Sequence, residues 1–163
     1  MSAASGLALV KPEFRNPMLT TSRGTGELIL AALEQGVRKM IIGIGGSATN
    51  DAGAGMLQAL GVRLQKDDGS EIAAGGQGLA AIRNIDADHL DNRLASCSIE
   101  VACDVDNPLV GPRGASAVFG PQKGATPDMV TVLDCNLKRF GLLLEQHANR
   151  RILDVPGAGA AGA

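Results

Sequence analysis

The stretch from Gly43 to Gly55 constrains this chain more than any other part of the sequence. The apolar run 40–44 before it is short and rich in β-branched residues, which predicts a buried strand. A loop of small and polar residues follows, and a helix is predicted from about Ala52 to Leu60. A strand, a glycine-rich loop and a helix in this order bring backbone N–H groups and the positive end of a helix dipole close to a bound anion. The stretch therefore predicts a phosphate or carboxylate site.

Backbone and side-chain groups of this loop could bind and orient such an anion. The expected binding groups are the backbone of two glycines, two hydroxyls and one amide, from Gly45, Gly46, Ser47, Thr49 and Asn50. Asp51 is the loop's one ionisable group, and its carboxylate could accept a proton from a substrate hydroxyl or hold a magnesium ion. The alternative interpretation is that Asp51 or Asn50 only caps the next helix and that the glycines serve tight packing.

A second group of polar residues follows a second predicted strand. Residues 98–103 alternate in a way that indicates another buried strand, and Asp104 and Asp106 come directly after it. The carboxyl ends of parallel strands are where α/β proteins place their chemistry. Two carboxylates there could share a divalent cation, with Asp104 the better candidate for catalysis because it lies closer to the strand. The alternative is an Asx turn that ends the strand at Asn107-Pro108.

Two cations lie within glycine-rich turns further along the chain. Arg113 is found in the run 111–116, and Lys123 in the run 119–125. A cation held in a tight turn can bind phosphate, so both are candidate phosphate ligands. The alternative is that each is an ordinary solvated surface charge.

The remaining pattern predicts an α/β fold with a mixed, partly parallel sheet and flanking helices. Helices are predicted at 27–35 and from Thr126, as N-cap, to about His147. A hairpin is predicted between 62–65 and 70–72, with Asp68-Gly69 in its turn. No linker divides the 163 residues, which read as one unit.

Composition excludes several classes of function. The formal net charge is −2 and only 2% of the residues are aromatic, so neither a cationic surface nor stacking platforms for nucleic acid are expected. No apolar run approaches the length of a membrane span. The three cysteines, at 97, 103 and 135, lack disulfide or zinc spacing, which indicates a reduced, cytoplasmic protein.

Residues 43–48 also contain a weak dinucleotide fingerprint, G-x-G-x-x-A. Such a site requires an acidic residue at the end of a parallel strand about 20 residues later. The candidates, Asp67 and Asp68, fall in the predicted hairpin turn instead. A nicotinamide-binding domain is therefore kept only as the weaker alternative. A P-loop is excluded, because G-x-x-x-x-G-K-[ST] is absent from the sequence.

Five ordered blocks of the chain closely resemble the bacterial glycerate kinases of the glyoxylate and glucarate pathways. The blocks are 24–27, 43–55, 102–109, 111–116 and 119–125. The resemblance implies ATP-dependent phosphorylation of D-glycerate to 2-phosphoglycerate with Mg²⁺. It also implies a two-domain α/β architecture with the active site in the cleft between the domains.

The same resemblance predicts that residues 1–163 are a central portion of the family fold. The family's N-terminal strand and its later Thr-Gly-Glu-Gly block have no counterpart in this sequence. We therefore expect N- and C-terminal parts of the fold to be missing, and the activity of this chain by itself is left open. The alternative function is a non-catalytic binding or structural piece, which would associate with itself through the surface that the missing parts cover.

Overall fold

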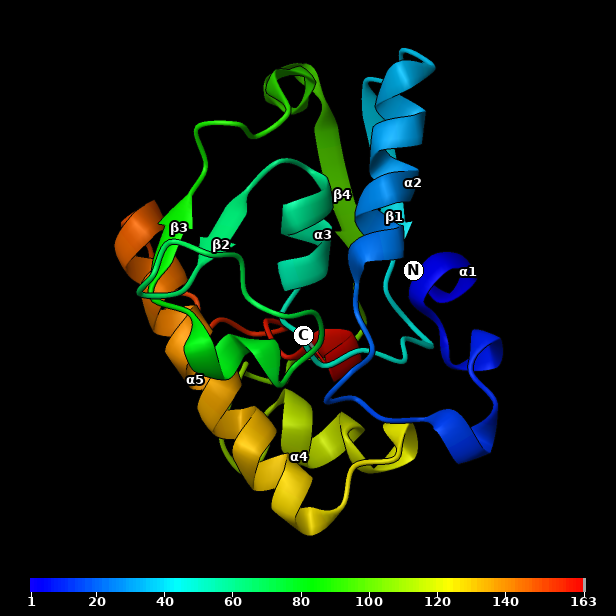
Figure 1. Cartoon of the computed structure of the whole chain (residues 1–163). Coiled ribbons are helices and arrows are strands. Elements are labelled where there is room, and N and C mark those ends of the chain that lie inside the picture. Colours follow the sequence, from blue (N-terminus) through cyan, green and yellow to red (C-terminus); the bar gives the residue numbers. More distant parts are fainter. Residues whose placement is uncertain (163) are drawn as a thin grey trace.

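The computed structural model describes residues 1–162, in which helices pack against two small, separate sheets (Figure 1). The α-helices are α1 (Ser2–Ser5), α2 (Arg23–Glu34), α3 (Ala54–Ala59), α4 (Ala115–Phe119) and α5 (Pro127–Ala148). The strands are β1 (Lys39–Gly43), β2 (Arg63–Gln65), β3 (Asn84–Asp86) and β4 (Ser98–Ala102). Short 3₁₀ helices connect them: η1 (Leu7–Leu9), η2 (Pro12–Phe14), η3 (Gly78–Ala81), η4 (Asn92–Ser96), η5 (Pro121–Lys123) and η6 (Ala160–Gly162). The predicted α/β class is confirmed.

β1 and β4 form a parallel pair, as the sequence predicted. Their register runs from Lys39 opposite Ser98 to Gly43 opposite Ala102. α2 covers part of one face, where Ile29, Leu33, Met40 and Leu60 form a core cluster. Because the strands are parallel and in register, their carboxyl ends meet at one edge. The glycine loop and the Asp104 segment therefore leave the sheet side by side.

β2 and β3 form a separate antiparallel pair that packs with α5. Leu64 lies opposite Ile85 in this pair. The larger core cluster joins the pair to α5, and its fully buried members include Leu64, Leu79, Ile82, Leu137 and Phe140. α5 begins as predicted, with the Thr126 hydroxyl accepting a hydrogen bond from the Met129 N–H at 3.3 Å. The long helix thus fixes the half of the molecule that carries α4 and η5.

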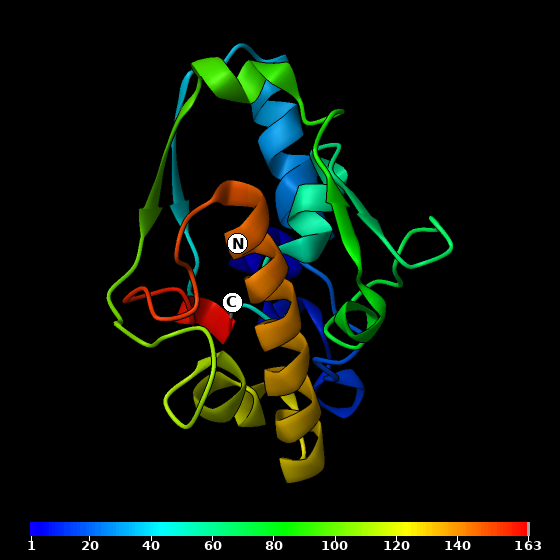
Figure 2. The same ribbon diagram turned by 90° about the vertical axis from the view of Figure 1, so that its left-hand side faces the viewer.

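The prediction that β4 is a buried strand is wrong for this chain. All five of its residues are exposed, and Val101 exposes 56% of its surface. Ile41 of β1 is also exposed, at 69%. Figure 2 shows the pair at the edge of the molecule, away from α5. Parallel strands are normally covered on both faces, so the apolar residues of β4 were expected inside. The described residues supply too few neighbours to cover them.

Element bounds also differ from expectation. α2 starts at Arg23 rather than at 27. α3 starts at Ala54 rather than at about Ala52, because Ala52 and Gly53 have φ angles of +48° and +72°. These left-handed residues turn the chain sharply after Asp51. The predicted hairpin is present as an antiparallel bridge between Gln65 and Glu71, with the Ile72 N–H donating to the Leu64 carbonyl oxygen at 2.9 Å, and β2 also pairs with β3.

Candidate active site

The backbone of the glycine loop is open to solvent where it leaves β1. Gly43, Gly45 and Gly46 are all exposed. A Cβ atom built on Gly43 or Gly45 would meet no atom within 4 Å. Space beside glycine backbone is what a ligand needs to come close to main-chain N–H groups. This part of the loop can therefore receive an anion.

The polar side chains of the same loop point the other way, into the protein. Ser47 exposes 2% of its surface, and Thr49, Asn50 and Asp51 expose none. The sequence places these residues in one loop but does not show which of their side chains face inward. The open surface of the loop is thus backbone, and its side chains hold that backbone from behind.

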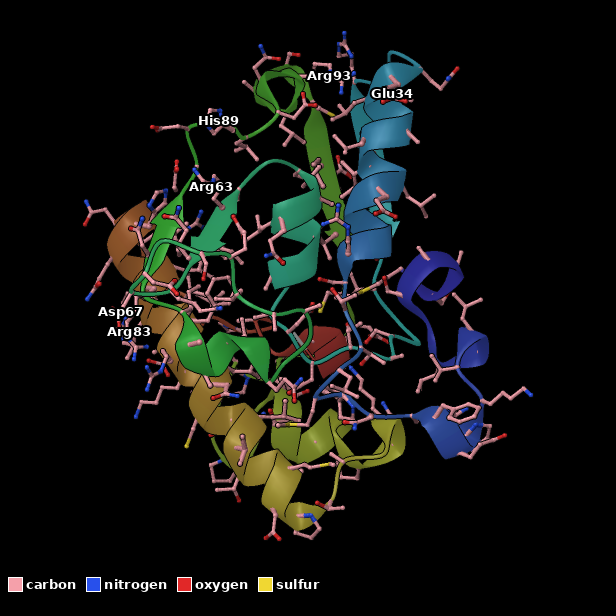
Figure 3. All side chains as sticks on the ribbon, in the orientation of Figure 1. Glu34, Arg63, Asp67, Arg83, His89 and Arg93 are labelled. Carbon is pink, nitrogen blue, oxygen red and sulfur yellow. The ribbon has the colours of Figure 1, made fainter. Side chains whose placement is uncertain are left out.

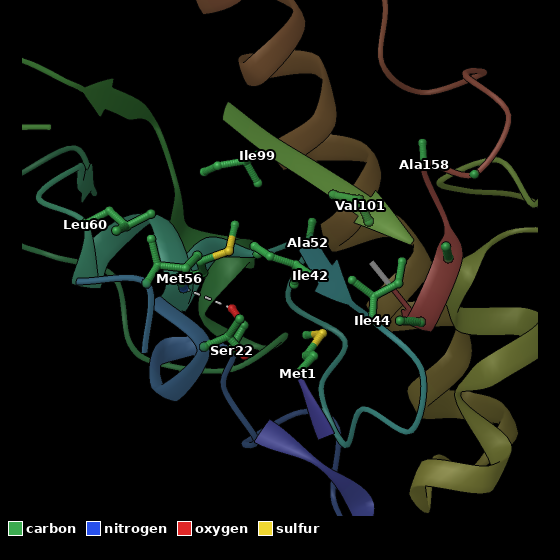
Figure 4. Close-up of a pocket in the computed structure, with 16 residues that line it drawn as sticks. Met1, Ser22, Ile42, Ile44, Ala52, Met56, Leu60, Ile99, Val101 and Ala158 are labelled. Carbon is green, nitrogen blue, oxygen red and sulfur yellow. Dashed lines mark hydrogen bonds between the residues drawn. The ribbon is translucent and has the colours of Figure 1, made fainter. Parts of the chain in front are cut away.

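Asp51 joins the start of α2 to the start of α3. Its Oδ2 accepts hydrogen bonds from the Ser22 N–H at 2.8 Å, the Ser22 hydroxyl at 2.9 Å and the Gly55 N–H at 3.3 Å. The Ser22 oxygen in turn accepts from the Met56 N–H at 3.0 Å, the dashed line in Figure 4. Burial raises the pKa of Asp51, and the hydrogen bonds from Ser22 and Gly55 oppose that rise. Its Oδ1 is buried without a hydrogen-bond partner.

Lys123 is the second buried charged group, with 1% of its surface exposed. Its ammonium donates to the Ser47 Oγ at 2.8 Å and to the carbonyl oxygens of Thr49 and Ala161. Burial lowers the pKa of Lys123 to about 7, against the opposing attraction of Asp51. Lys123 therefore lies behind the loop, and binding of phosphate by this residue stays a prediction.

A third buried contact holds Asn50. The Ser116 hydroxyl on α4 donates to the Asn50 Oδ1 at 2.9 Å, and Ser116 exposes none of its surface. Ser22 and Ser116 are functional candidates that sequence reasoning missed. Each lies within or beside a block that resembles the family, but each contacts a residue 29 or 66 positions away. Nothing local in the sequence indicates such contacts.

Asp104 reaches the open side of the loop. It lines a cavity of about 130 Å³ together with Gly45, Gly46, Ser47 and Gln122. The cavity's further lining comes from both strand ends, Phe119 and the segment at Ala160 and Ala161. Asp104 and exposed glycine backbone thus line one small cavity, an arrangement that could hold a phosphate together with a cation.

Asp106 and Arg113 pair with each other rather than with the loop. The Arg113 guanidinium donates to the Asp106 Oδ1 at 3.1 Å, and both side chains are mostly exposed. The Asn107 amide donates to the Arg113 carbonyl oxygen at 2.8 Å. Among residues 1–162, no three His, Cys, Asp or Glu side chains cluster as a metal site. Binding of metal by Asp104 and Asp106, and of phosphate by Arg113, stay predictions.

A larger, apolar cavity of about 300 Å³ lies beside the sheet (Figure 4). Ile42, Ile99 and Val101 form its sheet side, and Met56 of α3 and Leu60 just after α3 lie across from them. Ala160 and Ala161 line both this cavity and the smaller one. The C-terminal segment therefore forms a wall between the two.

The acidic residues that a dinucleotide site would need lie elsewhere. Asp67 and Asp68 are exposed in the turn after β2, which pairs with β3 in an antiparallel sheet. Asp67 pairs with Arg83 at 3.3 Å, at the left edge of the molecule in Figure 3. Neither carboxylate is placed to accept a ribose hydroxyl beside the glycine loop.

The pKa of Lys123 predicts a specific pH dependence of stability. Between about pH 7 and pH 10 the unfolded chain binds a proton at Lys123 that the folded chain has lost, so the free energy of unfolding rises with pH. The expected rise from this group is about 2 kcal/mol between about pH 7 and pH 9. Urea denaturation at several pH values measures it. Lys123→Met should remove the rise, and an equal rise in the variant would contradict the assignment.

Comparison with known proteins identifies the chain's relatives. The model of the glycerate kinase family matches residues 1–163. A glycerate kinase from Bacillus subtilis is 60% identical over 162 residues, and a glycerate 2-kinase from Escherichia coli is 58% identical. A crystal structure of a protein assigned as glycerate kinase 2, from Salmonella typhimurium LT2, superposes with a TM-score of 0.97 at 59% identity.

These matches cover nearly all of this chain but less than half of each relative. The aligned region is 99% of this chain and 42% of the B. subtilis and E. coli proteins. For the Salmonella structure the shares are 99% and 44%. Within residues 1–162, no helix is long and apolar enough to span a membrane.

Proposed function

Because the chain belongs to the glycerate kinase family, we propose that it supplies part of an ATP-dependent kinase that converts D-glycerate to 2-phosphoglycerate. The observation that carries this proposal is the cavity shared by Asp104 and the exposed backbone of Gly45 and Gly46. Phosphoryl transfer depends mainly on positioning and on neutralising charge, and this cavity offers groups for both. A cytoplasmic location goes with the proposal, since ATP is the phosphoryl donor.

The candidate residues would have different roles in this reaction. The glycine backbone would hold the glycerate carboxylate or the transferred phosphoryl group by its N–H groups. The carboxylate of Asp104 fits Mg²⁺, which binds one or two carboxylates together with substrate phosphate oxygens, and Asp106 is the second candidate ligand. Bound there, the ion would neutralise charge on the phosphates. Asp51 could act on the substrate hydroxyl only through its Oδ1, because three donors occupy its Oδ2.

A chimeric kinase tests the proposal. In this protein, the 162 matched residues of the B. subtilis glycerate kinase are replaced by the present chain. We expect the chimeric kinase to phosphorylate D-glycerate in an assay coupled to ADP release, and its Asp104→Asn variant to lose at least about 100-fold in kcat. Asp88→Asn, at an exposed aspartate, is the matched control. A folded chimeric kinase that leaves D-glycerate untouched would overturn the proposal.

The exposed sheet favours a second candidate, a structural piece that associates with itself. Ile99 and Val101 are exposed apolar side chains on one face of the parallel pair, and Ile41 is exposed on the opposite face. Sedimentation of the 163-residue chain tests this directly. Self-association should be abolished by Val101→Lys but not by Val132→Lys, an equally apolar exposed site on α5. A wild-type chain that is monomeric at micromolar concentration would exclude this candidate.

A further inference from the structure

One buried amine joins three segments that are far apart in the sequence. The Lys123 ammonium at the end of η5 contacts Ser47 and Thr49 of the glycine loop, and Ala161 near the C-terminus. The Ser47 hydroxyl also donates to the Ala161 carbonyl oxygen. Lys123 and Ser47 therefore share an acceptor on the C-terminal segment, and the loop is tied to that segment at two points.

The hydrogen-bonding capacity of the amine is fully used by these contacts. In its protonated form the amine has three N–H donors, and Lys123 has three protein acceptors. With 1% of its surface exposed, it presents no donor to a ligand in the adjacent cavity. Its contacts Ser47 and Ala161 both line the cavity that holds Asp104. The lysine thus lies directly behind the cavity wall.

The backbone that carries Lys123 is itself held tightly. Gly124 has a φ angle of +92°, and a Cβ built on it would lie 2.4 Å from the Arg15 carbonyl oxygen. The Lys123 N–H donates to the Gly120 carbonyl oxygen at 2.9 Å, and the Gly124 N–H to that of Pro121 at 3.0 Å. A side chain anchored on such a turn can fix what it touches.

From this geometry we infer that Lys123 is a positioning residue: it fixes the glycine loop against the 157–161 segment and so sets the shape of the cavity beside Gly45 and Gly46. A direct phosphate contact, the role suggested by the sequence, is the competing interpretation. The inference takes only the identity of the ligand from the proposed function. The clamp itself is a property of this chain.

Hydrogen exchange on the 163-residue chain tests the clamp without any kinase assay. The probes are the amides of Ala48 and Gly159, which donate to Ser5 and Asn107 at 2.8 and 2.9 Å. In Lys123→Met both should exchange at least about tenfold faster, while amides inside α5 keep their rates. Lys138→Met, at an exposed lysine on α5, should change neither probe. Unchanged exchange at both probes in a folded Lys123→Met chain would overturn the inference.

Amide exchange in a second variant and the kinetics of the chimeric kinase also test the positioning role of Lys123. If Lys123→Met fails to fold, Ser47→Ala retains the lysine and should accelerate exchange of the same two amides by about threefold. No change in that variant would also overturn the inference.

In the chimeric kinase, a positioning role predicts that Lys123→Met lowers kcat at least about tenfold and leaves KM for ATP within about threefold. A direct phosphate ligand would instead raise KM, which contradicts the clamp. Because the exchange result does not depend on catalysis, an inactive chimeric kinase would count against the proposed function alone.

Discussion

Replacement of Asp51 by alanine is expected to lower the free energy of unfolding by about 3–5 kcal/mol. The carboxylate oxygen Oδ2 is the shared acceptor for two groups of Ser22 and the N–H of Gly55. Its removal leaves these donors buried without an acceptor, at the point where α2 and α3 are joined. Urea denaturation at about pH 7 measures the loss. Asp88→Ala, at an exposed aspartate, should stay within about 0.5 kcal/mol of the wild type.

Asp51→Asn separates the structural role of this residue from a catalytic one. The carboxamide oxygen can still accept from Ser22, so most of the stability should remain, and burial no longer has to oppose a charge. If the negative charge serves the reaction, kcat of the chimeric kinase should fall by about 100-fold or more in a protein that still folds. Normal turnover would show that Asp51 only supports the loop. A loss of less than about 1 kcal/mol in Asp51→Ala would contradict the structural role.

Gly45→Ala is expected to have the opposite signature, with catalysis lost and stability kept. The new Cβ meets no protein atom within 4 Å, and φ at Gly45 lies outside the left-handed range, so the fold accepts alanine. The methyl group would occupy the space that a ligand needs beside the backbone. We expect kcat/KM of the chimeric kinase to fall by about 100-fold.

Gly69→Ala provides the reverse control. Its Cβ also meets open space, but its φ of +78° strains an alanine, and it lies in a turn far from the cavity. It should cost about 1 kcal/mol of stability and leave kcat/KM unchanged. If Gly45→Ala were as active as Gly69→Ala, the exposed backbone would have no part in binding.

Local patterns were sufficient to predict much of this fold. The Thr126-Pro127 start and apolar spacing of α5 are encoded in consecutive residues. The parallel pairing of β1 with β4 followed from two apolar runs, each ending at a polar loop. The exposure of β4 could not be predicted, because it depends on which other segments pack against the strand. An apolar strand has the same sequence whether or not another layer covers it.

The direction in which the side chains of the candidate site point could not be predicted from the sequence. Small and polar residues at 45–51 indicated an anion site, yet which groups face the cavity depends on partners distant in the sequence. Lys123 and Ser47 are 76 positions apart, and Ser116 and Asn50 are 66 apart. The left-handed turn at Ala52 and Gly53, which ends the loop, also has no signal at Ala52. These contacts turn the polar side chains inward and leave glycine backbone on the open side.

We propose that the glycine backbone of the loop, rather than its buried side chains, receives the substrate. Titration of ¹⁵N-glycine-labelled chimeric kinase with D-glycerate and ADP, followed by amide chemical shifts, tests it most directly, with Gly45 assigned through the Gly45→Ala variant. The amides of Gly45 and Gly46 should shift and saturate, and that of Gly69, in a distant turn, should not move. Saturable shifts confined to glycines away from the cavity, with Gly45 and Gly46 unmoved, would contradict the claim.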